Sequence, residues 1–430
     1  MKIMKFGSRG PNVQFLQLAL NRAGAGPVLT DGLFGYATQN AVTAFQRSHS
    51  LPSDGIVGPQ TEQALMPWYT GFIIHTIRPG DTLYTIARMH HTTVRRVETA
   101  NPGLDPFQLI PGTRLTVPLA FPVVPTTIDW TSDVLAKTVV GLSARYPMIS
   151  VDSIGRSQMG ISIPCLALGT GPVPVLYNAA HHANEWITTP ILMKFAEDLA
   201  QAAMRDRPLY GISVRELLQR CRVYLVPMVN PDGVDLVTGM FTEGAEYDHT
   251  REIAANYPDI PFPAGWKANI AGIDLNLQYP AGWEQARAIK FAQGFCPPAP
   301  RDYVGPAPLS APESRAMAEF TQALRPRLTL SYHTQGRVIY WKYLDYEPEH
   351  SRAIAYRFAA ASGYLVEQTP YTAGFAGYKD WFLENYHLPG YTIEVGLGEN
   401  PLPLSQFEQI YQENLGILVL GAYLAAEIAP

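Results

Sequence analysis

A cluster of histidine and glutamate residues in the second half of the chain has the composition of a metal site. The segment Asn178–Glu185 reads Asn-Ala-Ala-His-His-Ala-Asn-Glu. His182 and Glu185 are three residues apart, and His181 and Glu185 are four apart, so in a helical turn either histidine shares a face with the glutamate. The spacing alone does not choose between the two histidines.

Two further residues give this cluster companions. His333 directly follows the apolar run Leu328–Tyr332, and Glu394 lies inside the run Tyr391–Val395. A carboxylate in an apolar strand is costly unless it faces a polar site or a cation. In open α/β sheets, sites form at the carboxyl ends of strands. Two histidines, one carboxylate ligand and a spare carboxylate suffice for a catalytic zinc site with a fourth position for water.

The elements that must position these residues alternate between strands and helices. Beyond about residue 128, apolar β-rich runs occur at 173–180, 223–229, 328–332 and 391–395. Helical patterns separate them, such as the one that contains Ile191, Phe195 and Leu199. Residues 128–430 are therefore predicted to form an α/β domain with a mixed central sheet flanked by helices.

Two smaller modules are expected ahead of this domain. The pattern Asp-Gly-x-x-Gly-x-x-Thr occurs at residues 31–38 and again, 23 residues later, at 54–61. Its glycines suit turns and its threonine suits a helix N-cap, so residues 1–68 are predicted to be a three-helix module. Residues 72–118 read as strand, helix, helix, strand, and residues 119–127 as a proline-containing linker.

Both front modules resemble cell-wall-binding domains. Through its repeated turn motif and its helical pattern, the first resembles the three-helix peptidoglycan-binding domain. The second resembles a LysM domain through Pro79-Gly-Asp-Thr-Leu83, Asn101-Pro102 and Pro111-Gly112. The resemblance implies binding of peptidoglycan and of glycans that contain N-acetylglucosamine, with the two modules together gaining avidity.

Residues from about 125 to 427 resemble the zinc carboxypeptidase family. The resemblance implies one zinc ion bound by His182, Glu185 and His333, with Glu394 in Thr-Ile-Glu-Val as the general base. It implies further roles for several residues, namely Asp274 as the carboxylate that orients the first histidine, Asn276 as a substrate-binding residue and Tyr371 as a mobile active-site tyrosine.

Several arginines that are typical of this family are replaced. Leu277 stands where an arginine would bind the terminal carboxylate of the substrate, and Asn184, counted among the substrate-binding residues, stands where another arginine lies between the first two ligands. Because an arginine fork is the natural partner of a carboxylate, these replacements argue against trimming of single terminal residues. Lys267, Arg301 and Arg337 are candidates to supply the missing positive charge.

Composition excludes several other classes of protein. Of the 430 residues, 47% are hydrophobic and 16% charged, so the chain as a whole is not disordered. With 32 basic and 37 acidic residues the formal charge is −5, so no nucleic-acid partner is expected. Three widely spaced cysteines imply no disulfide framework. The apolar stretch 415–426 is too short for a membrane span and predicts a packed terminal helix, and the N-terminus has no apolar run of signal-peptide length.

The combined architecture resembles the γ-D-glutamyl-L-diamino acid endopeptidases of endospore-forming bacteria. This predicts a hydrolase that cuts the amide between D-glutamate and diaminopimelate in peptidoglycan stem peptides and muropeptides. A metallocarboxypeptidase and a catalytically silent wall or spore-coat binding protein are the alternatives. The expected location is the cell wall or the spore, from the mother-cell compartment during sporulation, with the cytoplasm as the alternative.

Overall fold

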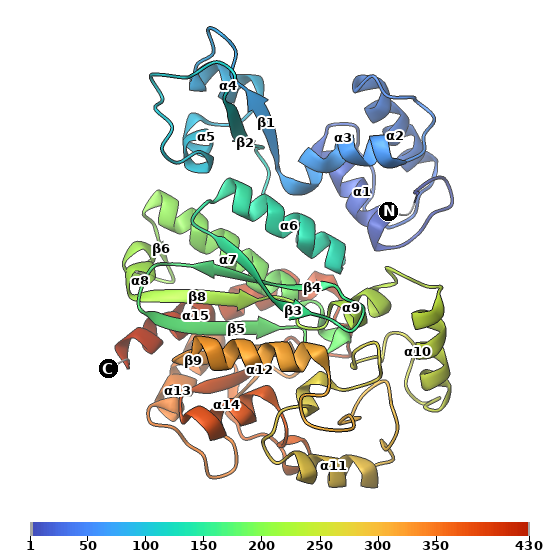
Figure 1. Ribbon diagram of the computed structural model, residues 1–430, viewed down its shortest axis with the longest axis vertical. Coiled ribbons are helices and arrows are strands. Elements are labelled where there is room, and N and C mark those ends of the chain that lie inside the picture. The colour runs from blue at the N-terminus through green and yellow to red at the C-terminus, as the bar shows by residue number, and fades with distance from the viewer. Residues whose placement is uncertain (1–2, 429–430) are drawn as a thin grey trace. The chain divides into compact units, whose positions relative to one another are not determined.

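The computed structural model describes residues 3–428, which form two compact units (Figure 1). The front unit comprises residues 3–129 and 133–150. The large unit comprises residues 130–132 and 151–428. Among the described residues, no helix combines the length and the apolar character that crossing a bilayer demands.

The front unit begins with the three expected helices, α1 (Pro11–Arg22), α2 (Tyr36–Ser48) and α3 (Pro59–Thr70). The buried amide of Gln17, on α1, holds the first repeated loop. Its Nε2 donates to Asp31 Oδ1 at 2.8 Å and to Thr38 Oγ1 at 3.1 Å, and its Oε1 accepts the backbone N–H of Gly32 at 2.9 Å.

The second repeated loop is held by the same set of atoms. Gln46 Nε2 donates to Asp54 Oδ1 at 2.9 Å and to Thr61 Oγ1 at 3.1 Å, while Gln46 Oε1 accepts the backbone N–H of Gly55 at 2.9 Å. Each glutamine side chain is 1% exposed. The sequence repeat is thus a repeat of two identical hydrogen-bonded loops, which we call the amide clamps.

A βααβ module follows α3 in the front unit. Its elements are β1 (Phe72–Thr76), α4 (Leu83–Met89), α5 (Val94–Ala100) and β2 (Arg114–Pro118). The two strands are antiparallel, and an apolar core between strands and helices includes Ile86, Val97 and Val117. Asp81, in the turn before α4, lies 3.0 Å from Nε2 of His75 and ties that turn to β1.

Two arginines fix the segment that was predicted to be a linker. Arg22 donates to the carbonyl oxygen of Pro122 at 3.0 Å. Arg145, on helix α6 (Ser132–Arg145), donates to the carbonyl oxygens of Leu119 at 2.8 Å and of Phe121 at 2.7 Å. Because Arg145 is 4% exposed, its two bonds are largely shielded from water and hold the segment against α6.

An eight-stranded mixed sheet forms the centre of the large unit, in the order β11-β10-β12-β9-β5-β8-β4-β3. The strands are β3 (Ser150–Arg156), β4 (Ser162–Leu168), β5 (Val173–Ala179), β8 (Cys221–Val226), β9 (Leu328–Thr334), β10 (Val338–Tyr340), β11 (Leu365–Glu367) and β12 (Gly390–Val395). The four central strands run parallel. A separate hairpin joins β6 (Pro208–Leu209) and β7 (Ile212–Ser213).

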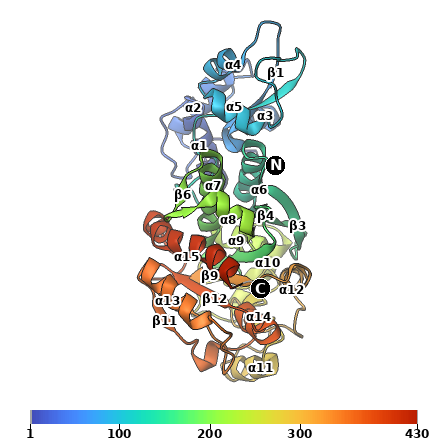
Figure 2. The ribbon, with the colours of Figure 1, turned by 90° about the vertical axis from the view of Figure 1, so that its left-hand side faces the viewer.

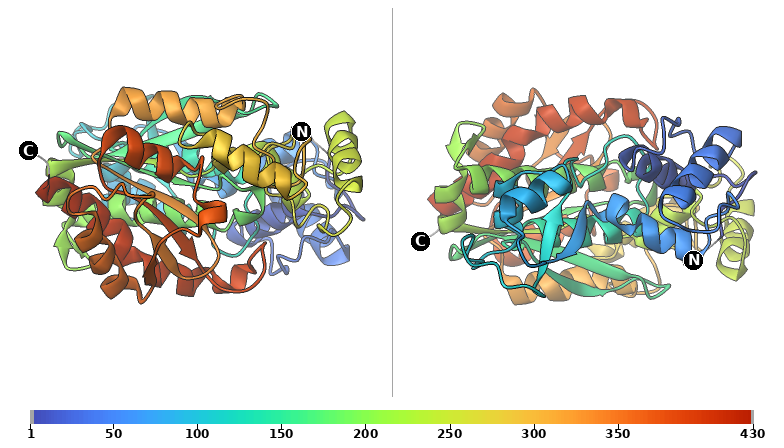
Figure 3. Two further views of the ribbon diagram at one scale, coloured as in Figure 1. Left: turned by 90° about the horizontal axis from the view of Figure 1, so that it is seen from below. Right: turned by 90° about the horizontal axis from the view of Figure 1, so that it is seen from above.

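Helices cover both faces of this sheet (Figures 2 and 3). The α-helices that lie wholly in the large unit are α7 (Thr188–Arg205), α8 (Val214–Arg220), α9 (Pro231–Thr238), α10 (Ala245–Ala255), α11 (Trp283–Ala292), α12 (Pro312–Leu324), α13 (Ser351–Ser362), α14 (Tyr378–Tyr386) and α15 (Phe407–Glu427). Tyr177 on β5 bonds to a carbonyl of α15, whereas its neighbour Leu176 packs into the cluster with Met317 of α12 and Trp381 of α14. The predicted α/β fold is confirmed.

Strand register brings two of the predicted site residues together. On the parallel pair β9 and β12, His333 is the direct partner of Glu394. β5 ends one strand away, and the chain then turns at Ala180, which has a φ of 51°. A short 3-10 helix, Ala183–Glu185, follows this turn. All these segments end at the same edge of the sheet, where sites form in open α/β folds.

Candidate metal centre and active site

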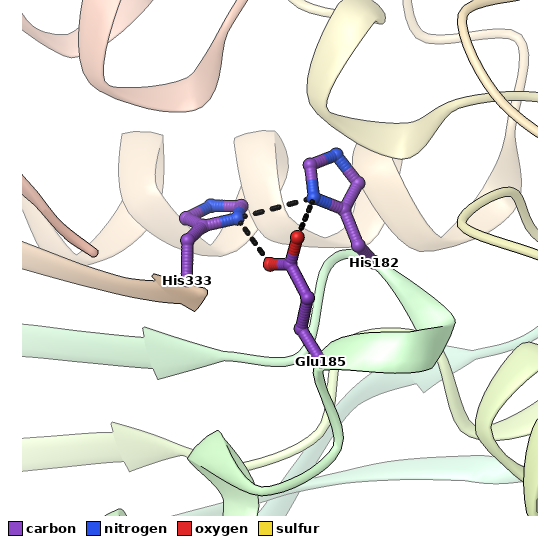
Figure 4. A group of neighbouring side chains, drawn as sticks. All are labelled: His182, Glu185 and His333. Carbon is purple, nitrogen blue, oxygen red and sulfur yellow. Dashed lines mark hydrogen bonds and ion pairs between the residues drawn. The ribbon is translucent and has the colours of Figure 1, made fainter. Parts of the chain in front are cut away.

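Three side chains converge on one point at the carboxyl end of the sheet (Figure 4). Nδ1 of His182 lies 2.9 Å from Glu185 Oε1, and Nδ1 of His333 lies 2.9 Å from Glu185 Oε2. The two ring nitrogens are 3.3 Å apart. Two imidazoles and one carboxylate are the donor set of many catalytic zinc sites. Glu185 is only 1% exposed, and because a buried carboxylate is costly without a positive charge beside it, a cation is the natural partner of this cluster.

The structure distinguishes the two adjacent histidines. His182 faces Glu185, whereas Nε2 of His181 bonds to the hydroxyl of Tyr279 at 3.0 Å. Complete burial, and then the neighbouring His333 and His182, lower the pKa of His181 well below the usual value. His181 is therefore a neutral, packed side chain beside the cluster.

A second carboxylate orients His182 from behind. Asp274 Oδ1 lies 3.2 Å from Nε2 of His182, and Asp274 Oδ2 accepts the backbone N–H of Asp302 at 3.1 Å. Burial works against ionisation of Asp274, but His182 and the N–H donors outweigh it and hold its pKa well below the usual range. Likewise, burial would lower the pKa of His182, yet Glu185 and Asp274 raise it to about 9. The ring is thus held with Nδ1 toward the cluster, as a metal ligand requires.

Glu394 stands beside the cluster without belonging to it. It lines a cavity of about 270 Å³ together with His182 and Lys267. Burial, and then the Glu185 carboxylate, raise the pKa of Glu394 to about 8, with Lys267 acting in the opposite direction. A carboxyl group with a raised pKa can take up a proton and release it again near neutral pH.

Of the three candidate cations, two line this cavity. Lys267 Nζ lies 2.9 Å from Glu185 Oε1, and Arg301 Nε lies 2.6 Å from Asp302 Oδ2. Arg337 instead pairs with Glu413 at 2.9 Å and is absent from the residues that line the cavity. Positive charge is therefore present at the site even though the expected arginines are missing.

The remaining predicted site residues differ in their surroundings. Asn276 lines the cavity, and its Oδ1 accepts the backbone N–H of Tyr378 at 3.0 Å. Asn184 is 3% exposed, donates to the carbonyl oxygen of Ala264 at 3.2 Å and does not line the cavity. Tyr371 is 63% exposed and lines an adjoining hollow. The structure thus brings Asn276 to the metal cluster and leaves Asn184 and Tyr371 outside its cavity.

Four charged residues that line the cavity were not predicted from the sequence, namely Lys290, Asp302, Lys379 and Asp380. Lys290 Nζ lies 2.5 Å from Asp302 Oδ1, and Asp302 has a φ of 65°, a backbone conformation that sequence patterns do not reveal. Lys379 and Asp380 had a visible signal, because they interrupt the otherwise aromatic run Tyr378–Phe382.

Comparison with known families agrees with this architecture. Residues 135–416 match the family model for zinc carboxypeptidase. Residues 9–65 match the model for a peptidoglycan binding domain, and residues 75–118 match that for a LysM domain. The predicted identities of all three parts are confirmed.

Individual relatives give the same picture. The chain is 44% identical over 283 residues to "Gamma-D-glutamyl-L-diamino acid endopeptidase 1" of Lysinibacillus sphaericus, covering 66% of this chain and 69% of that protein. It is 24% identical over 302 residues to carboxypeptidase B of Rattus norvegicus, covering 66% of this chain and 64% of that protein.

Solved structures share the fold. Carboxypeptidase A from Helicoverpa armigera matches with a TM-score of 0.53 at 21% identity, covering 70% of this chain and 74% of that one. Together with the convergence of His182, Glu185 and His333 at the sheet edge, the family model and the relative of Lysinibacillus sphaericus identify the large unit as a metallopeptidase domain. The chain belongs to the zinc carboxypeptidase family and carries a peptidoglycan-binding domain and a LysM domain ahead of its enzyme domain.

Proposed function

We propose that the protein is a zinc-dependent peptidoglycan hydrolase that cuts the γ-D-glutamyl–diaminopimelate amide of stem peptides. The observation that carries the proposal is a single cavity lined by the side chains of His182, Glu394 and Lys267. Leu277 lines the same cavity, at the position where a carboxypeptidase would have the arginine that binds the terminal carboxylate. Support comes from the relative of Lysinibacillus sphaericus whose name describes this bond, and from the two wall-binding domains.

His182, Glu185 and His333 would hold the metal, since their ligand atoms all lie within 4.8 Å of one another. A zinc ion bound there supplies a positive charge that acidifies water and polarises an amide carbonyl. Asp274 fixes the ring of His182 through its Nε2, so that Nδ1 stays directed at the metal position. The protein residues thus pre-organise the site before substrate arrives.

Glu394 would carry the proton. It accepts a proton from the attacking water, whose oxygen bonds to the carbonyl carbon, and returns that proton to the leaving nitrogen as the C–N bond breaks. The raised pKa of Glu394, due first to its burial, suits both halves of this transfer. One carboxylate therefore serves as base and then as acid.

Lys267 would stabilise the negative charge that develops on the carbonyl oxygen. Its ammonium group bonds to Glu185, next to the metal position. Burial lowers the pKa of Lys267, but the attraction of the Glu185 carboxylate outweighs this effect, so the pKa is raised. It therefore stays charged. Arg301, on the cavity wall, is a second cation that can face substrate carboxylates, whose natural partner is a guanidinium group.

The wall-binding domains would keep the enzyme on its substrate. Tethering raises the effective concentration of stem peptides around the active site without any new contact there. We propose that this action takes place at the cell wall or at the spore wall, with the enzyme supplied from the mother-cell compartment during sporulation.

Mass spectrometry of muropeptides tests the proposal. Disaccharide tripeptides and tetrapeptides are incubated with the zinc-loaded chain, with a chelator-treated sample alongside. Release of diaminopimelate or diaminopimelyl-D-alanine supports the endopeptidase. Loss of only a terminal D-alanine would make the protein a carboxypeptidase, and retention of wall binding without any cleavage would make it a silent wall-binding protein.

A further inference from the structure

An exposed pair of aromatic rings lies on the three-helix module of the front unit. Tyr36 is 73% exposed and Phe6 is 49% exposed, yet the two rings contact each other, with their centroids 4.6 Å apart and their planes tilted by 43°. Leu33, three residues before Tyr36, is 44% exposed as well. Aromatic side chains stabilise a protein chiefly when they are buried, so an apolar patch that stays in water usually marks an interaction site.

Backbone pairing brings the two rings together from segments that are distant in the sequence. The N–H of Gly7 donates to the carbonyl oxygen of Phe34 at 2.9 Å, and the N–H of Phe34 donates to the carbonyl oxygen of Ser8 at 2.9 Å. Residues 6–9 therefore lie alongside the loop of the first amide clamp, which leads directly into Tyr36 at the start of α2. The aromatic pair is thus built into the folded module.

The sequence repeat shows that the clamp itself does not require Tyr36. The two clamps share their aspartate, glycine and threonine positions, but the residue after the second glycine is Tyr36 in the first clamp and Pro59 in the second. Each of these residues is the first of its helix, α2 or α3. Proline suits this position because its ring presets the helical φ, a benefit that tyrosine does not bring. The aromatic ring at the first clamp therefore points to a ligand.

Two cations flank the aromatic pair. Lys5 and Arg9 are exposed and lie on either side of Phe6 along the same segment. The acidic residue of the neighbouring loop, Asp31, instead turns its Oδ1 atom to the amide of Gln17 at 2.8 Å. An aromatic surface with positive charges at its edge is complementary to a ligand that combines an apolar face with carboxylates.

We propose that Phe6 and Tyr36 bind the glycan strand of peptidoglycan by stacking against its sugar rings. A pyranose ring presents a flat face of C–H groups, which packs on an aromatic ring while the polar substituents stay at the rim in water. The stem peptides on the strand carry carboxylates, which Lys5 and Arg9 can meet.

The match of residues 9–65 to a peptidoglycan binding domain fits this ligand, and Phe6 lies ahead of the matched residues. The inference rests on the wall attachment in the proposed function. It does not depend on which bond the enzyme domain cuts.

Nitration of tyrosine tests the contact on the full chain. Tetranitromethane modifies exposed tyrosines, and peptide mapping by mass spectrometry follows each one separately. Tyr356 on α13, which is 56% exposed, serves as the internal reference. Glycan strands freed of their stem peptides, at about twice their Kd, should slow nitration of Tyr36 about 3-fold and leave that of Tyr356 unchanged. Protection of Tyr36 by free stem peptides alone would overturn the inference.

Variants at the same position measure what the contact contributes to wall binding. The full chain is treated with a chelator so that it does not cut, and is sedimented with purified sacculi. Tyr36→Ala should weaken binding about 5- to 10-fold, and Tyr36→Trp should keep it, because an indole ring also stacks. Tyr356→Ala is the matched control and should bind as the unchanged chain does. Because Tyr36 is 73% exposed, its replacement should leave thermal unfolding nearly unchanged.

Other outcomes separate this inference from wall attachment as a whole. Equal binding of sacculi by Tyr36→Ala and by the unchanged chain would refute the role of the aromatic pair and leave wall attachment intact. A dimer in sedimentation velocity that Tyr36→Ala dissociates would also refute it, since the pair would then be a contact between copies of the chain. If the unchanged chain bound no sacculi, wall attachment and the inference would fail together.

Discussion

The Asp274 carboxylate lies behind His182, 3.2 Å from the ring nitrogen that faces away from Glu185. The same carboxylate accepts the backbone N–H of Asp302 through its other oxygen, so both of its oxygens are engaged. It is therefore fixed in position before it acts on the histidine. A ligand held in this way needs little reorganisation when a metal binds.

Replacing Asp274 by asparagine should weaken zinc binding by about 10- to 100-fold. Each oxygen of Asp274 now has one partner, His182 Nε2 or the Asp302 N–H. In asparagine one of these oxygens becomes an NH₂ group, so one of the two contacts loses its acceptor. Zinc affinity is measured by competition with a coloured chelator. Asp232→Asn alters another buried aspartate, which bonds to Ser157, and should leave the affinity as it was. Unaltered affinity in Asp274→Asn would show that the contact does not orient the ligand.

Replacing Glu394 by glutamine should keep zinc and lower kcat by about 10²- to 10⁴-fold, because an amide cannot accept the proton of water. Metal content by atomic emission and kcat on muropeptides are measured on the same preparation. Glu399→Gln, at an exposed position, serves as the matched control. Zinc loss or a nearly normal rate in Glu394→Gln would refute the assigned role.

Replacing Lys267 by methionine should lower kcat by about 10²- to 10³-fold, with a smaller change in KM, because the charge acts mainly on the developing oxyanion. Lys267→Arg should recover much of the rate, since it restores the positive charge. Steady-state kinetics on a purified muropeptide separate the two parameters. A rise in KM alone would instead make Lys267 a group that binds the substrate in its ground state.

Glu313 should make stability depend on pH. It is fully buried, with its oxygens on the Gln158 N–H and the Asn269 amide, and burial raises its pKa to about 7. The unfolded chain releases this proton near pH 4.5, before the folded chain does, so stability falls by ~3 kcal/mol as pH rises from about 4.5 to 7.

Thermal and urea unfolding across this pH range check the prediction. The Glu313→Gln chain has no proton to release at this position. Between pH 4.5 and 7 its free energy of unfolding should therefore fall by ~3 kcal/mol less than that of the unchanged chain, whatever the substitution costs at a single pH. Parallel pH profiles for the two chains would contradict it.

Much of the fold could be predicted from residue patterns. The apolar runs that contain Leu330 and Ile393 became parallel neighbours in the sheet, and the apolar C-terminal stretch became the buried part of α15. Such patterns report burial and periodicity, which are local properties of the chain. The two front modules were identified largely from turn residues for the same reason, whereas the large domain was identified from its histidine and glutamate motifs.

The site was only partly accessible to this reasoning. Spacing could not separate His181 from His182, because the choice depends on a turn at Ala180 with positive φ. The place of Lys379 in the cavity was not predicted, because it depends on α14 beginning at the cavity wall. These are relationships between distant segments, and they arise only when the sheet brings the segments together.

The two amide clamps of the front unit have a consequence for how the protein responds to its surroundings. Each loop is held by an uncharged glutamine, and backbone N–H groups, followed by that glutamine, keep the pKa of Asp31 and of Asp54 below the usual value. Acidification should therefore leave these loops closed, and the three-helix module should keep its fold in a more acidic medium than loops held by aspartates of ordinary pKa would allow.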